Sequence, residues 1–244
     1  MKDVWTIFKR ELSSFFSQPI AYAIIVIYLL LSMIFTFTLG SFIDAGDASL
    51  TYSFFLYQPF VLMVLVPAVG MRLWSEELRS GTIELIGTYP ISLWSVIQGK
   101  FKAAATVWLI AILLTFPIWI TVNWLGNPDN LAILSGYIGT YLLACTFLAI
   151  TLLVSAFTRD QVVCLIVASA ICIGLVFASF EPFVRQYSKT MSADVKDAIT
   201  AIGVWDHYMS LARGAFRLQD FVWFLSFIIA SLLGTSAILS AKRA

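Results

Sequence analysis

The side chains that could carry out chemistry in this sequence are few and scattered. The one histidine, His207, follows Asp206, and three cysteines, Cys145, Cys164 and Cys172, lie in apolar runs. A zinc site or a hydrolytic centre needs such groups in close pairs or beside a base. Because the sequence has no CxxC pair and no Cys/His cluster, we expect no metal site. We interpret the thiols as small buried apolar residues and His207 as a surface or loop-packing residue.

A nucleotide-hydrolysing site is not expected in this chain either. A phosphate-binding loop has the pattern G-x-x-x-x-G-K-[ST], whose amides cradle the phosphates. Gly99-Lys100 is the only Gly-Lys pair, but Trp94 and Phe101 occupy the positions of the first glycine and of the Ser or Thr. We therefore predict that the chain is not an enzyme and binds no cofactor. If ATP drives this protein, another polypeptide binds it.

The composition indicates a lipid environment. Of the 244 residues, 60% are hydrophobic and 12% are charged, and the mean hydropathy is +0.91. A soluble domain is about 45–50% apolar and about 25% charged, so a soluble enzyme and a disordered chain are excluded. The net charge of +1 provides no long-range field to attract nucleic acid. The chain is therefore predicted to be a polytopic membrane protein.

Six apolar stretches without Asp, Glu, Lys or Arg are each near the ~20 residues that a bilayer-spanning helix needs. They are Ile20–Ile43, Tyr52–Met71, Ala103–Trp124, Leu131–Phe157, Val162–Phe180 and Phe221–Ala241. The predicted fold class is all-α, with six transmembrane helices in a single domain over residues 1–244. An ion-coupled carrier is disfavoured, because it usually places a titratable group within the membrane.

The distribution of cations orients these spans. If the N-terminus is cytoplasmic, six spans return the C-terminus to the same side, and ten of the fifteen Lys and Arg residues are inside. Cytoplasmic loops carry an excess of Lys and Arg. Both termini are therefore predicted to be cytoplasmic.

An amphipathic helix is predicted ahead of the first span, over residues 2–18. At 100° per residue, six apolar side chains fall on one face, while cations and serines gather opposite and Glu11 lies near the edge. The apolar residues are Val4, Trp5, Phe8, Leu12, Phe15 and Phe16. Such a helix lies in the membrane interface, and Pro19 then ends it.

The inner segment between the second and third spans, residues 72–102, contains both acidic and apolar residues. We expect Ser75 to cap a short helix with Glu76 and Glu77 in its first turn, where the helix dipole favours acid. Gly81 interrupts this helix and Pro90 ends it. Five further apolar residues would be costly to leave in water, so they need a membrane surface or a protein partner. They are Leu78, Ile83, Leu85, Ile86 and Tyr89.

The outer segment of residues 181–220 is the second long connection. A helix is predicted over Val204–Leu218, with Trp205 on its apolar face and Arg213 alongside. It could re-enter the membrane, close the outer mouth or dock a partner, and we interpret it as an outer lid that includes His207.

Uncharged polar residues remain within the spans. Gln58, next to Pro59, is the strongest candidate to line a pathway, together with Tyr57. The alternative is that Gln58 makes an interhelical hydrogen bond. Such a weakly polar pathway suits a lipid-like or protein-linked cargo better than a bare ion.

The order of these motifs resembles a known family. The run from Glu76-Glu77 through Gly81-Thr82-Ile83-Glu84-Leu85 and Tyr89-Pro90-Ile91-Ser92 to Gly99-Lys100 is similar to the signature of ABC exporter permeases of the type-2 class. The opening from Phe8 to Pro19 and the stretch from Trp205 to Asp220 resemble the gliding-motility (Gld) branch of that class. The resemblance covers the whole chain and its six-span layout.

The resemblance implies a function. The chain would be the permease of an ATP-driven exporter in the bacterial cytoplasmic (inner) membrane. Two permease subunits, identical or related, would form the pathway, and two cytosolic ABC ATPase subunits would bind ATP and Mg²⁺. The inner segment would be the coupling helix that contacts the ATPase, with six residues carrying the coupling: Glu76, Glu77, Gly81, Thr82, Glu84 and Pro90.

An auxiliary membrane protein with an extracytoplasmic domain is also implied by the Gld resemblance. The alternative from a different class is a membrane anchor or scaffold, which recruits a cytosolic ATPase without moving any cargo.

Overall fold

The computed structural model describes residues 2–40, 50–82, 91–187 and 192–242. These residues form helices and connecting turns, and no strand occurs among them. Six helical stretches of the described residues are long and apolar enough to cross a membrane. The fold class predicted from the sequence, an all-α polytopic membrane protein, is confirmed.

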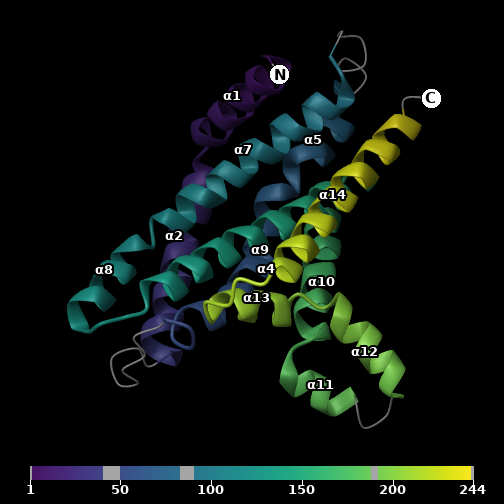
Figure 1. Cartoon of the computed structure of the whole chain (residues 1–244). Helices are drawn as coiled ribbons and strands as arrows, with labels where there is room; N and C mark the ends of the chain where they lie inside the picture. Colours follow the sequence, from purple (N-terminus) through teal and green to yellow (C-terminus); the bar gives the residue numbers. More distant parts are fainter. Residues whose placement is uncertain (1, 41–49, 83–90, 188–191, 243–244) are drawn as a thin grey trace.

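The helices follow one another with few long connections (Figure 1). A π-helical turn, Phe35–Leu39, extends α2, and a 3-10 turn, Phe55–Tyr57, precedes α4. In chain order the α-helices are α1 (Lys2–Ser17), α2 (Pro19–Ile34), α4 (Gln58–Gly70), α5 (Arg72–Ser80), α7 (Leu93–Leu113), α8 (Phe116–Leu125), α9 (Asn130–Phe157), α10 (Gln161–Ala178), α11 (Glu181–Tyr187), α12 (Ala193–Ile202), α13 (Trp205–Ala212) and α14 (Leu218–Ala241).

Helix α9 forms the centre of the bundle, and the other spans pack around it. In its most apolar stretch 78% of the residues are buried, against 22% in α10. Its N-terminus is capped by the Asp129 carboxylate, which accepts hydrogen bonds from two backbone amides. Gly136 lets the Phe55 ring approach closely, since a Cβ there would lie 2.5 Å from that ring. The three cysteines are free and buried, as predicted.

The predicted N-terminal helix is confirmed, and its position in the membrane interface stays a prediction. Helix α1 lies along α7 (Figure 1), with Ile7, which does not belong to the predicted apolar stripe, buried between them. Trp5, which belongs to that stripe, is 57% exposed and stacks on Phe8, so its surface is open to contact lipid. Pro19 is the first residue of α2, where its missing amide hydrogen costs no helical hydrogen bond.

Helix α4 runs almost directly into α5, so the capping role predicted for Ser75 is wrong. Only Met71 separates the two helices, and Ser75 lies one turn inside α5. Its hydroxyl donates to the backbone carbonyl of Met71 instead of capping a helix N-terminus. Because the chain is already helical before Ser75, no free amides remain there to be capped.

The inner segment, residues 72–102, therefore contains more helix than predicted. It begins with α5 and ends with the first part of α7, which starts at Leu93 rather than at Ala103. Ser92 caps α7 by accepting from the Ser95 amide. The third membrane stretch, Leu93–Leu125, consequently includes Lys100, which lay outside the predicted span.

The predicted helix over Val204–Leu218 is shorter in the structure. Helix α13 ends at Ala212, and Gly214 adopts a left-handed conformation with φ of 82°. A new helix, α14, begins at Leu218. The apolar spacing correctly indicated α13, but it could not show that Gly214 turns the chain.

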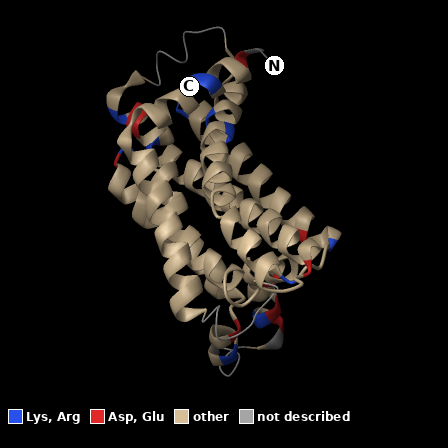
Figure 2. Cartoon of the chain, turned by 90° about the vertical axis from the view of Figure 1, so that its left-hand side faces the viewer, with Lys and Arg blue, Asp and Glu red and all other residues tan. Residues whose placement is uncertain are grey.

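Charged residues gather at the two ends of the bundle (Figure 2). The start of α1 and the end of α14 lie at one end, together with α5, whereas α11 and α12 lie at the other (Figure 1). We call these the terminal end and the distal end. The uncharged middle matches the part of a membrane protein that contacts hydrocarbon.

Candidate functional site

Helix α5 carries the predicted acidic pair, Glu76 and Glu77, at the terminal end of the bundle. Gly81 ends this helix in a left-handed conformation, with φ of 74°, which confirms the predicted interruption. Beyond it, the Thr82 hydroxyl lies 2.9 Å from the Ser80 hydroxyl. The helix is therefore a short arm with a defined end, attached rigidly to α4.

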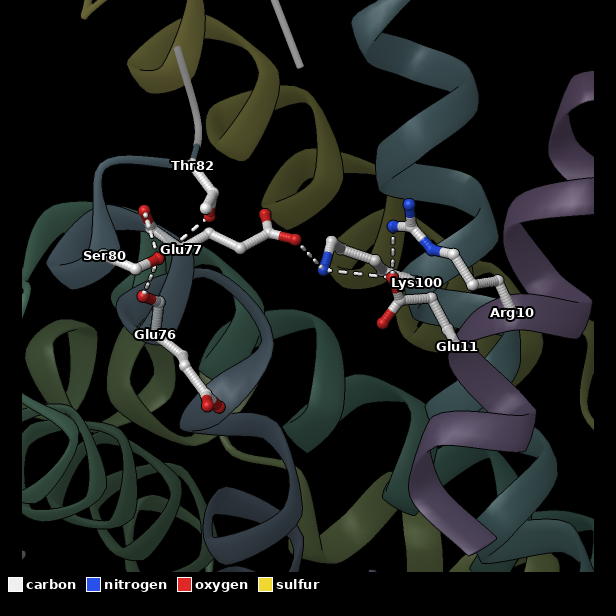
Figure 3. A network of polar contacts seen from close by, with 7 residues as sticks. All are labelled: Arg10, Glu11, Glu76, Glu77, Ser80, Thr82 and Lys100. Carbon is white, nitrogen blue, oxygen red and sulfur yellow. Dashed lines mark hydrogen bonds and ion pairs between the residues drawn. The ribbon is translucent and has the colours of Figure 1, made fainter. Parts of the chain in front are cut away.

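A buried lysine joins this arm to two other helices (Figure 3). The Lys100 Nζ of α7 lies 2.8 Å from Glu77 Oε1 of α5 and 3.5 Å from Glu11 Oε1 of α1. Arg10 in turn donates to Glu11 over 2.8 Å, and this hydrogen bond raises the pKa of Arg10 above its ordinary value. We call these four residues the Lys100 cluster.

Three members of the Lys100 cluster are largely shielded from water, whereas Arg10 is exposed. The side chain of Lys100 is 3% exposed, and those of Glu77 and Glu11 are 19% and 15% exposed. The ammonium also lies 5.2 Å from the centroid of the Trp74 ring, within range of a cation–π contact. A charge at this depth is tolerated only when it is paired, so these contacts hold the three helices in one arrangement.

Close backbone packing supports the same junction. Gly99, the neighbour of Lys100, faces Ile7 of α1, and a Cβ added to it would lie 2.6 Å from Ile7 Cγ2. The absence of a side chain at Gly99 therefore lets α1 and α7 approach one another. This approach brings Glu11 to Lys100.

The arrangement suits the transmission of force rather than bond-making chemistry. The acids of the Lys100 cluster are occupied by cations, and no nucleophile lies among its four residues. Within the described ranges no group of three or more His, Cys, Asp or Glu side chains is placed to hold a metal ion. What remains is a mechanical junction between an arm at one end of the bundle and two neighbouring helices.

The comparison with protein families decides what kind of membrane protein carries this junction. A model of the family described as "ABC-2 family transporter protein" matches residues 5–180. The chain belongs to this family. It is thus a membrane component, a permease subunit of an ABC transporter, and is not itself the ATPase. A search of curated proteins finds no match.

The coupling residues predicted for this ABC-2 transporter lie in different settings. Glu77 belongs to the Lys100 cluster, whereas Glu76 is 54% exposed and pairs with Arg72 one turn earlier in α5. Gly81 and Thr82 lie at the end of the arm. Glu84 and Pro90 are outside the described residues, so their positions cannot be compared with the prediction.

Sequence reasoning missed three members of the Lys100 cluster as site residues: Lys100, Glu11 and Arg10. Lys100 was considered as part of a Gly-Lys pair and as an inner cation, and Glu11 as an edge residue of an amphipathic helix and as part of the opening that resembles the Gld branch. A signal was present in the helical spacing, because Ile7 and Glu11 lie one turn apart and share a face. Their partner on α7 is distant in sequence, so the pairing itself required the structure.

The two pathway candidates of the ABC-2 transporter lie between helices. Gln58 is fully buried, accepts a hydrogen bond from the Tyr28 hydroxyl over 2.9 Å and lies 3.5 Å from the Ser32 hydroxyl. Tyr57 is half-buried and stacks on Phe35 at 5.8 Å. Within this chain Gln58 thus has the interhelical role that we considered as the alternative, and the pathway role of Tyr57 stays a prediction.

Replacing Gln58 with leucine is expected to destabilise the bundle by about 1 kcal/mol, because it leaves the Tyr28 hydroxyl without its partner in an apolar environment. Thermal unfolding in detergent measures this change. Tyr28→Phe removes the same bond, so the double variant should cost less than the sum of the single variants. Strictly additive costs would show that the two side chains do not interact.

The predicted lid residues lie at the distal end. Trp205 is buried, with Phe60 at 5.5 Å and Phe180 at 4.7 Å between ring centroids. His207 Nδ1 lies 2.7 Å from Asp220 Oδ1, and its ring stacks on Trp223. Arg213 is exposed, just after the end of α13.

Asp206 lies beside this histidine in the sequence but is not its ion-pair partner in the structure, since His207 contacts Asp220. Partial burial raises the pKa of Asp206 above its ordinary value, and the nearby His207 opposes this shift. The lid function of the segment remains a prediction.

Proposed function

We propose that this ABC-2 permease subunit belongs to an exporter, which moves cargo outward by alternating access. A separate ATPase subunit, which binds ATP and Mg²⁺, drives the cycle; membership of the family supports such a partner. The observation that carries the proposal is the 2.8 Å ion pair between Lys100 and Glu77, because it joins the arm α5 to a long apolar helix. A displacement of α5 by a cytosolic partner reaches the bundle through this contact.

The proposed mechanism follows the connections of α5. When ATP closes the ATPase dimer, the segment from Glu76 to Pro90 moves with it. Helix α4 follows because only Met71 separates it from α5, and α7 follows because Lys100 is paired with Glu77. The second and third spans then shift together relative to α9, which changes the side of the membrane to which the pathway opens.

The assembly that we propose has two permease subunits, identical or related, and two cytosolic ABC ATPase subunits. The terminal end faces the cytoplasm, so both chain termini are cytoplasmic, as the excess of Lys and Arg on that side favours. The location is the bacterial cytoplasmic membrane. Nucleic acid is not a partner.

The finer assignment to the Gld branch is part of the proposal, and with it an auxiliary membrane protein with an extracytoplasmic domain. Such a protein would meet the distal end, where α11 and α12 project from the bundle (Figure 1). The uncharged middle of the bundle supports a lipid-like or protein-linked cargo.

Replacing Glu77 with alanine is expected to uncouple ATP hydrolysis from transport while leaving membrane insertion intact. The Lys100 ammonium then loses its 2.8 Å partner and keeps only Glu11 at 3.5 Å, so α5 is no longer held to α7. The permease is purified in mild detergent with its ATPase, and the response of ATP hydrolysis to permease binding is measured beside transport in vesicles. A several-fold loss of that response is expected.

The control is Glu181→Ala, which removes an exposed carboxylate at the distal end, where Glu181 pairs with Arg185. It should leave coupling unchanged. Full coupling in Glu77→Ala would overturn the proposed route through the Lys100 cluster. An ATPase that binds the chain without any ATP-dependent transport would support the scaffold alternative.

A further inference from the structure

A cavity of about 340 Å³ lies between α1, α2, α4 and α5 at the terminal end, next to the Lys100 cluster. Its lining has two chemically different halves. Helices α1 and α5 supply polar and charged side chains, among them Glu11, Arg72 and Glu76, and Gln18 lies between α1 and α2. The adjoining ends of α2 and α4 supply apolar side chains such as Ile24 and Ala68, and α7 contributes Lys100. The cavity is thus amphiphilic and lies where the apolar spans give way to charged helices.

The charged half of the cavity contains both cationic and anionic side chains. Arg72 donates to Gln18 over 2.9 Å and lies 3.6 Å from Glu76, contacts that engage two of the five N–H donors of a guanidinium. Glu77 also lines the cavity, and its Oε2 is buried without a hydrogen-bond partner among the described residues. Three acids and two bases line the cavity in total, a net charge of −1, namely Glu11, Glu76, Glu77, Arg72 and Lys100.

This charge pattern discriminates among ligands. A phosphate group pairs with a guanidinium, and an ammonium group pairs with carboxylates. A ligand with only negative charge would meet three acids, two of them already holding Lys100. A ligand that carries a phosphate and an ammonium together is complementary to Arg72 on one side and to the Glu76 and Glu77 carboxylates on the other.

The size and the surroundings of the cavity indicate where such a ligand comes from. Its volume lies at the lower end of the range for small-molecule sites, about 300–1,000 Å³, which suits a headgroup better than a whole lipid. Ile20 lines the cavity and is 42% exposed on α2, whose outer face also presents Tyr22 and Val26. The cavity therefore adjoins an apolar surface along which acyl chains can lie.

We propose that this cavity binds the headgroup of a zwitterionic phospholipid with a primary ammonium, with its phosphate against Arg72 and its ammonium against Glu76 and Glu77. The acyl chains lie in the bilayer beside α2. All three contacts of the headgroup come from α5, so the bound lipid joins α5 to the bilayer beside α2. The site belongs to the permease chain itself and needs no ATPase to form.

The test is native mass spectrometry of the delipidated full-length chain, titrated with phosphatidylethanolamine or with phosphatidylglycerol of identical acyl chains. We expect one phosphatidylethanolamine molecule to bind, with a dissociation constant at least about tenfold lower than that of phosphatidylglycerol. Arg72→Gln should weaken the binding of both lipids, because both carry the phosphate, and Arg79→Gln, a change of the same kind on the exposed side of α5 away from the cavity, should leave both affinities unchanged. Glu76→Gln removes a carboxylate that faces the ammonium and should abolish the preference for phosphatidylethanolamine.

A second pair of variants tests the cavity without changing charge. Ala68→Phe fills the cavity and should abolish the preferential binding of phosphatidylethanolamine. Ala170→Phe adds the same volume on the exposed face of α10 and should leave this binding unchanged. Equal binding of the two lipids by the unmodified chain would overturn the proposal, and so would an unchanged preference in both Glu76→Gln and Ala68→Phe. Displacement of bound phosphatidylethanolamine by an equal concentration of soluble glycerophosphoethanolamine would show that the acyl chains contribute nothing to binding. This result would contradict the proposal that the occupant is a lipid.

Discussion

Replacing Lys100 with methionine is expected to lower the stability of the permease by about 3–5 kcal/mol, the cost of breaking a buried ion pair by removing one partner. For a chain of this size this corresponds to a fall of about 10 °C in the unfolding midpoint. The reason is that the carboxylates of Glu77 and Glu11, which are 19% and 15% exposed, lose the ammonium that lies between them. Coupling to the ATPase should be lost as well.

Thermal unfolding in detergent measures the first effect, and Lys102→Met is the matched control. Lys102 lies two residues further along α7 and is exposed, so its replacement should change the midpoint little. A midpoint for Lys100→Met equal to that of Lys102→Met would contradict the buried pairing.

A triple variant separates stability from coupling. Lys100→Met combined with Glu11→Gln and Glu77→Gln removes all three charges, and apolar or neutral replacements of a buried ion cluster are often nearly neutral in stability. We expect most of the lost stability to return while ATP-driven transport stays low, because the direct link between α5 and α7 is gone. Full transport in the triple variant would show that packing alone transmits the motion of α5.

Replacing Gly99 with leucine is expected to cost about 1–3 kcal/mol, as overpacking of a tight contact does, and to reduce coupling. Even a Cβ at this position would lie 2.6 Å from Ile7 Cγ2 and 2.9 Å from Ile7 Cβ. These atoms are close to the backbone of α1, so the helix itself must move away. Its displacement carries Glu11 away from Lys100.

Gly174→Leu is the matched control, since a Cβ on Gly174 of α10 meets no atom within 4 Å. Unfolding midpoints of both variants, with Gly99→Ala and Ile7→Ala combined in a double-mutant cycle, measure the effect. The double variant should cost less stability than the sum of the two single variants, because Ile7→Ala removes the methyl group closest to the new Cβ. If Gly99→Leu behaved like Gly174→Leu, α1 would not be packed on α7 as described.

The outcome for the inner segment shows how far sequence reasoning extends. The acids of α5 and the break at Gly81 were recognisable from residue types, because glycine adopts most readily the left-handed conformation that ends many helices. The predicted cap at Ser75 failed because capping depends on whether the preceding residues are helical. Local chemistry alone did not reveal that α4 continues almost to this point.

The distal end shows the same limit. Apolar spacing correctly indicated a helix around Trp205 and Tyr208, whose hydroxyl donates to the Phe55 carbonyl over 2.8 Å. It also predicted that this helix includes Arg213 and Arg217, but the helix ends at Ala212 and Gly214 turns the chain in a left-handed conformation. His207 was interpreted as a surface or loop-packing residue, and its hydrogen-bond partner, Asp220, comes from the start of α14.

The sequence by itself determined the class of this protein: six spans, an N-terminal helix and an acidic arm, because lipid demands long apolar helices and excludes unpaired charge. Only the tertiary structure decided that Lys100 is buried, that Glu11 and Glu77 neutralise it, and that Gln58 bonds between helices. These pairings join residues that are far apart in the chain, and their energy depends on burial. No local pattern of residues specifies which helices meet.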